Sequence, residues 1–393
     1  MTIRPFLVAA ALLALPGTVP AQTSLDFIRV AVVRADPEVS LQIHGRFTIS
    51  ALHTGTAIQQ GRRLPPMSVR AVQEGIQLGD EVIPVYGVRV EPERSATISL
   101  NGKRLRGTLE IVRQKNLTLL IINHVALEEY LRGVLSKEAP DYWPEEALKA
   151  IAIAARTYAV YQRASKAQVD YDVTGDVMSQ DYGGKTAEKA ATTRAVKETA
   201  GLILAYHGKL FPTFYHSTCG GMTEHSRVMG DYNIEPLQGG IACSLCAASP
   251  FFKWQRRLTR ADLAWALRKS SHGSIGTIRD VRVTKRTPSG RAQEITLSGS
   301  LRTLRLTGYD LRVLLGFEQI RSTFFTVEPV GDDFVVEGHG WGHGVGLCQW
   351  GSAELARRGL LAPEILSYYY RGATLVSLQD VSAQPIQLIG GTP

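Results

Sequence analysis

An alanine-rich helical pattern at residues 144–163, PEEALKAIAIAARTYAVYQR, constrains the fold of this chain more than any other stretch. Pro144 suits the first position of a helix, because its missing N–H would be unpaired there, and the two glutamates that follow lie favourably in the first turn. Apolar residues recur at helical spacing from Leu148 to Ala159, and the alanines between them allow close approach by other elements. The pattern therefore predicts a buried helix at the centre of the molecule.

Strand-like segments precede this helix and a mixture of elements follows it. Residues 24–122 alternate apolar and polar side chains or are rich in β-branched residues, with Gly, Asn and Pro between the runs. Later in the chain, residues 259–269 predict a short amphipathic helix that begins with a capping box of Thr259 and Asp262. The expected fold class is therefore α+β, with a β-rich N-terminal region and a mixed α/β core.

The N-terminal stretch MTIRPFLVAAALLALPGTVPAQTS is typical of a secretory signal peptide. Arg4 precedes an apolar run, Pro16 ends the run, and small residues lead to an expected cleavage site after Ala21. An uncleaved anchor is the alternative, although the run is too short to span a bilayer. We expect an exported mature protein, located in a periplasm or a cell wall, that is not an integral membrane protein.

These patterns divide the chain into regions. The expected regions are a signal peptide at 1–21, a β-rich N-terminal region at 22–122, a core at 123–381 with partly inserted strands and helices at 243–330, and a loose C-terminal tail at 382–393.

The formal net charge of +8 and the pI near 9.3 indicate an anionic partner. For an exported protein, cell-wall glycan or a membrane surface is such a partner. Nucleic acid is disfavoured by the compartment and by the lack of a Lys/Arg block interleaved with aromatic residues.

The stretch GHGWGHGVG, residues 338–346, contains five glycines and two histidines. Glycine permits a positive φ and lets the backbone lie against a ligand. The stretch lacks the Gly-Lys-Ser/Thr ending of a phosphate-binding loop. Three readings stay open at this point: a loop that lines a substrate groove or supplies an acid or base, a metal pair of His339 and His343, and a structural turn.

Two ligand pairs suggest a structural metal site. His216-x-x-Cys219 and Cys243-x-x-Cys246 flank a 23-residue loop, a spacing close to that of zinc ribbons. His225 is an alternative fourth ligand. A disulfide between Cys243 and Cys246 is plausible in an oxidising compartment, and unligated thiols are the third possibility.

Four stretches in this order resemble the SpoIID/LytB family, named for a sporulation protein and a modifier of a wall amidase. The first stretch contains a glutamate before Ala-Pro. The next three contain, in order, the elements Gln-x-Tyr-x-Gly, Ser-Thr-x-Gly-Gly-x-Thr-Glu and Gly-His-Gly-x-Gly. The stretches are GVLSKEAPDYWPEEALKAIAIAARTY at 133–158, SQDYGG at 179–184, YHSTCGGMTE at 215–224 and GHGWGHGVGLCQWG at 338–351. The resemblance covers about residues 123–372, and the N-terminal region carries no motif of the family.

The resemblance implies a SpoIID-type core with a glycan-binding cleft. It also implies a peptidoglycan lytic transglycosylase that acts on glycan strands stripped of their stem peptides, with Glu138 as the catalytic acid. We expect Glu138 on irregular backbone, in a gap between two helices. The residues expected to contact the sugars are Tyr182, Ser217, Thr218, His339, His343 and Gln349.

One carboxylate suffices for this reaction. Ordinary glycosidases need two carboxyl groups, and the sequence offers no convincing partner for Glu138, with Glu224 as the only reserve. The C6 hydroxyl of muramic acid can attack its own anomeric carbon and form a 1,6-anhydro ring. Glu138 can then serve as acid and as base, provided that burial raises its pKa.

Two other functions stay open. The chain could bind glycan without cleaving it and assist a separate cell-wall amidase, as the modifier in the family name suggests. A zinc amidase would need an open site with three protein ligands, whereas the set of Cys219, Cys243, Cys246 and His216 looks closed. A structural zinc ion is accordingly the expected cofactor, and none is needed for catalysis.

Overall fold

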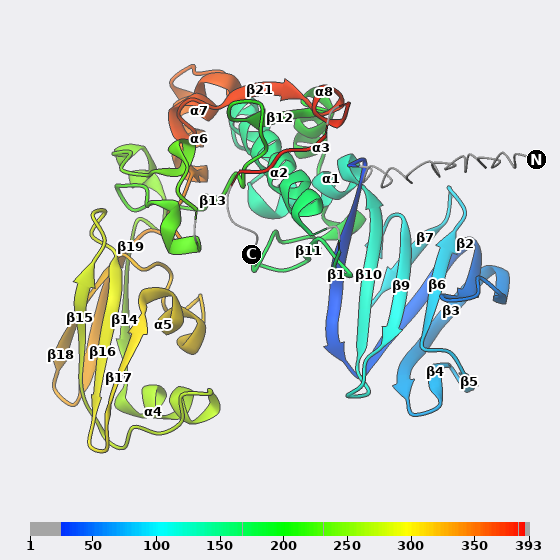
Figure 1. Ribbon diagram of the computed structural model, residues 1–393, viewed down its shortest axis with the longest axis horizontal. Helices are drawn as coiled ribbons and strands as arrows, with labels where there is room; N and C mark the ends of the chain where they lie inside the picture. The colour runs from blue at the N-terminus through cyan, green and yellow to red at the C-terminus, as the bar shows by residue number, and fades with distance from the viewer. Residues whose placement is uncertain (1–24, 167, 231, 384, 390–393) are drawn as a thin grey trace, which may run out of the picture.

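The computed structural model describes residues 25–166, 168–230, 232–383 and 385–389, so the predicted signal peptide lies outside the described residues. Figure 1 shows three parts side by side: a large sheet, a central group of helices, and a smaller domain at the opposite side from the sheet. The predicted mixture of helices and sheets is confirmed.

The N-terminal part is one large, mainly antiparallel sheet. The order of its main strands is β11-β1-β10-β9-β6-β2-β3-β4-β5, and β7 and β8 branch from β2. Alternate side chains of β1 and β2 are buried, as expected for strands that cover a core on one face. Its strands are β1 (Phe27–Asp36), β2 (Glu38–Ala51), β3 (Ala57–Val72), β4 (Gly75–Leu78), β5 (Glu81–Ile83), β6 (Gly87–Pro92), β7 (Thr97–Leu100), β8 (Lys103–Leu105), β9 (Thr108–Arg113), β10 (Leu119–Ala126) and β11 (Val173–Thr174).

Three helices, α1 (Leu127–Glu138), α2 (Glu145–Ser165) and α3 (Ala190–Glu198), follow the sheet. The prediction of a central helix is confirmed, because α2 is buried along most of its length and on all sides. Arg156 of α2 is fully buried and binds the carboxylate of Glu128 in α1 through two hydrogen bonds of 2.8 Å. Residues of β1, β9 and β10 share one hydrophobic core with α1 and α2, so the sheet does not pack as a separate unit.

The remainder of the core wraps around α2. Strand β13 pairs in parallel with β20, which brings His216 opposite Cys348, and β12 pairs with β21. In the predicted tail, Gln387 and Ile389 bond to the backbone of Leu210, so this segment is in part paired. The elements are β12 (Leu202–Ala205), β13 (Tyr215–His216), β20 (Leu347–Cys348), α6 (Gln349–Arg357), α7 (Ala362–Tyr369), β21 (Thr374–Ser377) and α8 (Leu378–Ser382), with 3-10 helices η1 (Gly184–Ala187), η2 (Ser226–Met229), η3 (Glu235–Leu237) and η4 (Ser244–Ala248).

A smaller domain is inserted between η4 and β20 and has its own hydrophobic core, which includes Trp254, Ile295 and Phe334. It contains two three-stranded sheets, β14-β19-β18 and β15-β16-β17. The predicted helix at 259–269 is confirmed as α4, together with its Thr259–Asp262 capping box. The elements are β14 (Lys253–Leu258), α4 (Arg260–Lys269), β15 (Ile278–Arg286), β16 (Ala292–Gly299), β17 (Thr303–Thr307), α5 (Gly308–Leu315), β18 (Phe325–Val330) and β19 (Asp333–His339).

The turn between β15 and β16 docks this inserted domain onto the core. The hydroxyls of Thr287 and Ser289 donate to the carboxylate of Glu224. The guanidinium of Arg291, which is 1% exposed, donates to the carbonyl of Cys219 at 2.6 Å. Glu224, the reserve carboxylate, therefore holds two domains together. Within the described part of the chain, no helix is long and apolar enough to cross a membrane.

Candidate active site and cysteine cluster

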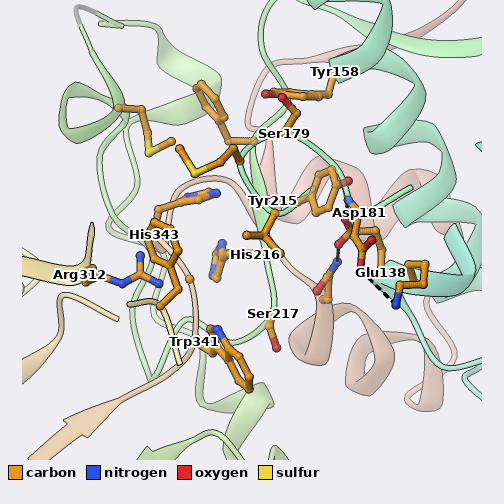
Figure 2. Close-up of a pocket in the computed structure, with 18 of the residues that line it drawn as sticks. Glu138, Tyr158, Ser179, Asp181, Tyr215, His216, Ser217, Arg312, Trp341 and His343 are labelled. Atoms are coloured by element: carbon orange, nitrogen blue, oxygen red, sulfur yellow. Dashed lines mark hydrogen bonds and ion pairs between the residues drawn. The ribbon is translucent and has the colours of Figure 1, made fainter. Parts of the chain in front are cut away.

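A pocket of about 540 Å³ lies between the core and the inserted domain, within the range of about 300 to 1,000 Å³ typical of ligand sites. The end of α1, the segments 177–181 and 214–217, the glycine-rich loop and α5 line it. Figure 2 shows Glu138, Asp181 and Tyr215 at one side of the pocket and Arg312, His343 and Trp341 at the other. Both parts of the protein contribute charges of both signs to the lining: Lys137 accompanies the two carboxylates of the core, and the inserted domain supplies Glu318 besides Arg312.

Glu138 is the last residue of α1, and not part of the irregular connection where we expected it. The helix continues to Glu138 because the backbone N–H of the next residue, Ala139, still bonds to the carbonyl of Leu135. Pro140 then follows, and the connection runs to Pro144 before α2 begins. The carboxylate therefore projects from the rigid end of a helix into the pocket.

Three donors hold the Glu138 carboxylate. The backbone N–H of Asp181 donates to Oε1 at 3.2 Å, and Nε2 of Gln349, the first residue of α6, donates to Oε2 at 3.1 Å. The Tyr215 hydroxyl also bonds to the carboxylate and is itself held by Nε2 of Gln180 at 2.8 Å. Both oxygens are thereby fixed in orientation.

The surrounding protein raises the pKa of Glu138 to about 7. Loss of solvation is the main cause, and the nearby charge of Asp181 adds to it, whereas the bonds from Gln349 and the Asp181 backbone favour the charged form and oppose the rise. The position at a helix C-terminus, where the dipole disfavours negative charge, acts in the same direction as burial. At neutral pH a substantial fraction of Glu138 is protonated.

The stability of Glu138→Gln relative to wild type is expected to increase as the pH rises from 4 to 8. Wild type gains stability from the raised pKa below pH 4.5 and loses it as pH rises to about 7, because the folded state then holds a proton that the unfolded state releases. The difference in free energy of unfolding between the two proteins should shift in favour of the variant by about 1 to 3 kcal/mol across this window. Chemical unfolding at several pH values measures it, and a constant gap would contradict the raised pKa.

Ser217, His343 and Gln349, three of the residues expected to contact sugars, line this pocket. The other three do not line it. Tyr182 is 1% exposed and its hydroxyl donates to Asn123, so the ring is a core support and cannot stack on a sugar. Thr218 is also buried and bonds to Ser249 at 2.8 Å.

His339, the third of these residues, lies at the end of β19 against the rings of Phe252 and Phe324.

The glycine-rich loop that follows His339 contains a position where a larger residue would clash. Gly342 has φ +113°, and a Cβ there would lie 2.7 Å from Cβ of His216. The loop therefore needs glycine in order to pack against β13.

Asp181 and Tyr215 are pocket residues that the sequence analysis did not single out. Both lie inside the recognised stretches. In the segment 179–182, Ser179 and Asp181 line the pocket while Gln180 and Tyr182 are buried. An alternation of this kind is the signal that could have selected Asp181 in place of Tyr182.

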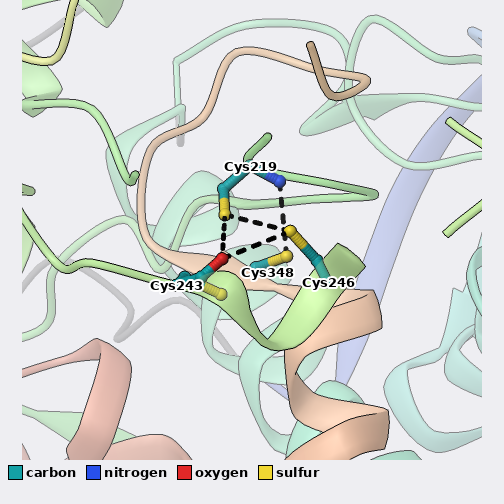
Figure 3. A group of neighbouring side chains, drawn as sticks. All are labelled: Cys219, Cys243, Cys246 and Cys348. Atoms are coloured by element: carbon teal, nitrogen blue, oxygen red, sulfur yellow. Dashed lines mark hydrogen bonds between the residues drawn. The ribbon is translucent and has the colours of Figure 1, made fainter. Parts of the chain in front are cut away.

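Four buried cysteines form a cluster, as Figure 3 shows. The sulfur atoms of Cys219, Cys243, Cys246 and Cys348 all lie within 4.8 Å of one another, and those of Cys219 and Cys246 are 3.4 Å apart. The backbone N–H groups of Cys219 and Gly351 donate to the sulfur of Cys348. A tetrahedral site with Zn–S bonds of about 2.3 Å would separate the sulfurs by about 3.8 Å, so the cluster matches such a site in size.

The cluster differs from the predicted ligand set, because Cys348 takes the place of His216. Strand β13 turns the His216 ring toward His343, with ring centres 5.6 Å apart. Its Nδ1 contacts the carbonyl of Val345. The parallel pairing of β13 with β20 instead brings Cys348 to the other cysteines. His225, the alternative ligand, receives a bond from the backbone of Arg227 and lies outside this group of four.

Comparisons with known proteins agree with the architecture. The family model of the stage II sporulation protein, SpoIID, matches residues 115–206, and a domain of unknown function matches residues 246–346, which include most of the inserted domain. An uncharacterised protein of Brachyspira hyodysenteriae is 32% identical over 323 residues, covering 81% of this chain and 84% of that protein.

Two relatives from Bacillus subtilis carry informative names. Stage II sporulation protein D is 29% identical over 311 residues, covering 74% of this chain and 87% of that protein. The amidase enhancer is 29% identical over 350 residues, covering 77% of this chain but only 49% of that protein. These matches support a role connected with the cell wall. With the recognised motifs gathered around one pocket, they show that the chain belongs to the SpoIID family.

Proposed function

We propose that this protein is a lytic transglycosylase of peptidoglycan that cleaves between N-acetylmuramic acid and N-acetylglucosamine in strands without stem peptides. The observation that carries the proposal is the Glu138 carboxyl group, which lines a pocket of suitable size and has a pKa raised to about 7. A general acid works best when its pKa lies near the working pH. Membership of the SpoIID family supports the choice of substrate.

The reaction needs one residue in two roles. Protonated Glu138 donates its proton to the glycosidic oxygen, and the bond between that oxygen and C1 of muramic acid breaks. The C6 hydroxyl of the same sugar attacks C1, and the Glu138 carboxylate accepts the hydroxyl proton. The acid is restored, no water is consumed, and the strand ends in 1,6-anhydro-muramic acid.

Asp181 forms an ion pair with Lys137 at 3.2 Å. We assign Asp181 the role of raising the pKa of Glu138, and not that of a second catalytic group. Gln349 and Tyr215 orient the acid through their hydrogen bonds. Such orientation brings the carboxyl group into reach of the scissile bond without reorganisation during the reaction.

Two variants should move the alkaline limb of the pH–rate profile in opposite directions. Asp181→Asn removes a charge that raises the pKa of Glu138, so the limb should shift to lower pH. Gln349→Ala removes a hydrogen bond that lowers this pKa, so the limb should shift to higher pH. Rate measurements from pH 5 to pH 9 test the pair. Shifts in the same direction, or none, would show that Glu138 does not set this limb.

We further propose that the four cysteines hold a structural zinc ion with no part in the reaction. The set of four sulfur donors forms a closed tetrahedral site of suitable size. The site would connect the β13–β20 pair to η4, and so place Ser217 and Gln349 on adjacent sides of the pocket. Disulfide bonds among the same cysteines are the alternative in an exported protein.

Mass spectrometry of the products from peptide-free glycan tests the main proposal. We expect fragments lighter by one water than hydrolysis products, because the anhydro ring replaces the reducing end. The relative named amidase enhancer supports a second candidate, in which the protein binds glycan and assists a cell-wall amidase. In that case the glycan would stay intact, and added protein would raise the rate of a purified amidase. We place either activity outside the cytoplasm, as the N-terminal sequence indicates.

A further inference from the structure

The side of the pocket opposite Glu138 contains a cation with no ionic partner. Arg312, from α5 of the inserted domain, is 4% exposed and lines the pocket. In the part of the chain that the structure describes, no carboxylate forms an ion pair with it. A buried charge without a partner is unfavourable and in a pocket it indicates a ligand of opposite charge.

Two backbone carbonyls and one aromatic ring hold the Arg312 guanidinium in place. Its Nε donates to the carbonyl of Ile320 at 2.9 Å, and its Nη2 donates to the carbonyl of Arg321 at 2.8 Å. It also lies over the ring of Phe317, 4.8 Å from the centroid. The remaining nitrogen, Nη1, has no hydrogen-bond partner among the described residues. The group is therefore fixed in orientation and keeps donor capacity for a ligand.

A second polar group without a hydrogen-bond partner belongs to a residue that lines the pocket. Nε2 of His216, a residue that is 4% exposed, is buried and has no hydrogen-bond partner among residues 25–389 as far as they are described. Figure 2 shows His216 between the Arg312 side and the Glu138 side of the pocket. Burial lowers the pKa of His216 and keeps its ring neutral, so it adds polarity but no charge.

We infer that Arg312 binds the free lactyl carboxylate of muramic acid and so selects glycan strands without stem peptides. The inference rests on the proposed function. In intact peptidoglycan the first residue of the stem peptide converts this carboxyl group into an amide, which is neutral and bulky. Removal of the peptide exposes one carboxylate on each muramic acid, a match for an arginine fork.

In this proposal the inserted domain contributes to the selection of the substrate. It carries Arg312 and Phe317, while the core carries Glu138, so the pocket is complete only when both parts are docked. Glu224 and the turn that bears Arg291 maintain this docking. The domain that supplies specificity is thus distinct from the part that supplies the acid.

Binding measured by calorimetry on the Glu138→Gln background tests the inference without turnover. One probe is peptide-free glycan, and the other is the same glycan with its lactyl carboxyls converted to methylamides. We expect the methylamide form to bind about 10- to 100-fold more weakly. Adding Arg312→Gln should remove this preference while binding of the methylamide form stays unchanged, which also shows that the variant is folded.

Two further variants sharpen the result. Arg312→Lys keeps the charge but loses the planar fork, so we expect a smaller preference for the carboxylate. Arg282→Gln is the matched control, since Arg282 is an exposed arginine of the same domain that pairs with Asp280 and does not line the pocket, and the preference should persist. Equal binding of both probes by the Glu138→Gln protein would overturn the carboxylate subsite and leave the glycan function standing. Binding of neither probe would overturn both.

Discussion

Glu138→Gln is expected to slow the release of anhydro-muramic fragments from peptide-free glycan by about 10²- to 10⁴-fold. Glutamine preserves the size of the side chain and its bond to a donor, but it has no proton to give to the leaving oxygen. Glu138 is placed at the end of α1 with a pKa raised to about 7, so the loss of the proton is the main change. Product analysis at neutral pH, wild type beside the variant, measures the effect.

Glu337→Gln is a suitable control for this experiment. Glu337 is an exposed residue of β19 that bonds to Gln255 on the neighbouring strand and does not line the pocket. Its replacement should leave the rate unchanged. Cleavage by Glu138→Gln at the wild-type rate would exclude Glu138 as the acid. Undiminished stimulation of an amidase by an inactive variant would favour the enhancer function.

Cys348→Ser is expected to remove the bound zinc and destabilise the protein. Purified wild type should contain about one zinc per chain, and the variant far less, because a closed site of four ligands loses one thiolate. Loss of a structural zinc should lower the free energy of unfolding by several kcal/mol, on the order of 10 °C in Tm. Metal analysis and thermal unfolding measure the two effects.

His216→Asn distinguishes the observed cluster from the ligand set expected from sequence spacing. We expect it to retain zinc, because the His216 ring contacts His343 and Val345 instead of the cysteine sulfurs. A metal-free wild-type protein with cysteines oxidised to disulfides would contradict the zinc proposal. Loss of zinc in His216→Asn, with zinc kept in Cys348→Ser, would restore the sequence-based set.

Local features were predictable from the sequence because they depend on neighbours along the chain. The buried helix α2 follows from its alanine and apolar pattern, and the capping box of Thr259 and Asp262 follows from a three-residue spacing. The gathering of motifs around Glu138 was expected from family resemblance alone, and the structure places Ser217, His343 and Gln349 with it in one pocket.

Features that depend on residue orientation were not predictable in this way. The irregular position expected for Glu138 was wrong, since α1 continues to this residue. Tyr182 and Thr218 belong to the recognised stretches but point into the protein. Motif spacing places a residue along the backbone, whereas the side of the backbone that faces a pocket is set by packing against distant segments.

The sequence by itself determined the mixture of helices and sheets and the helix at the centre, and its resemblance to a family singled out Glu138 as the candidate acid. Only the tertiary structure decided which fourth residue joins the cysteines, which carboxylate lies beside Glu138, and that Arg312 of the inserted domain faces the same pocket. The physical reason is distance along the chain. Strand pairing brings Cys219 and Cys348 into contact, and domain docking places Glu138 and Arg312 around one pocket.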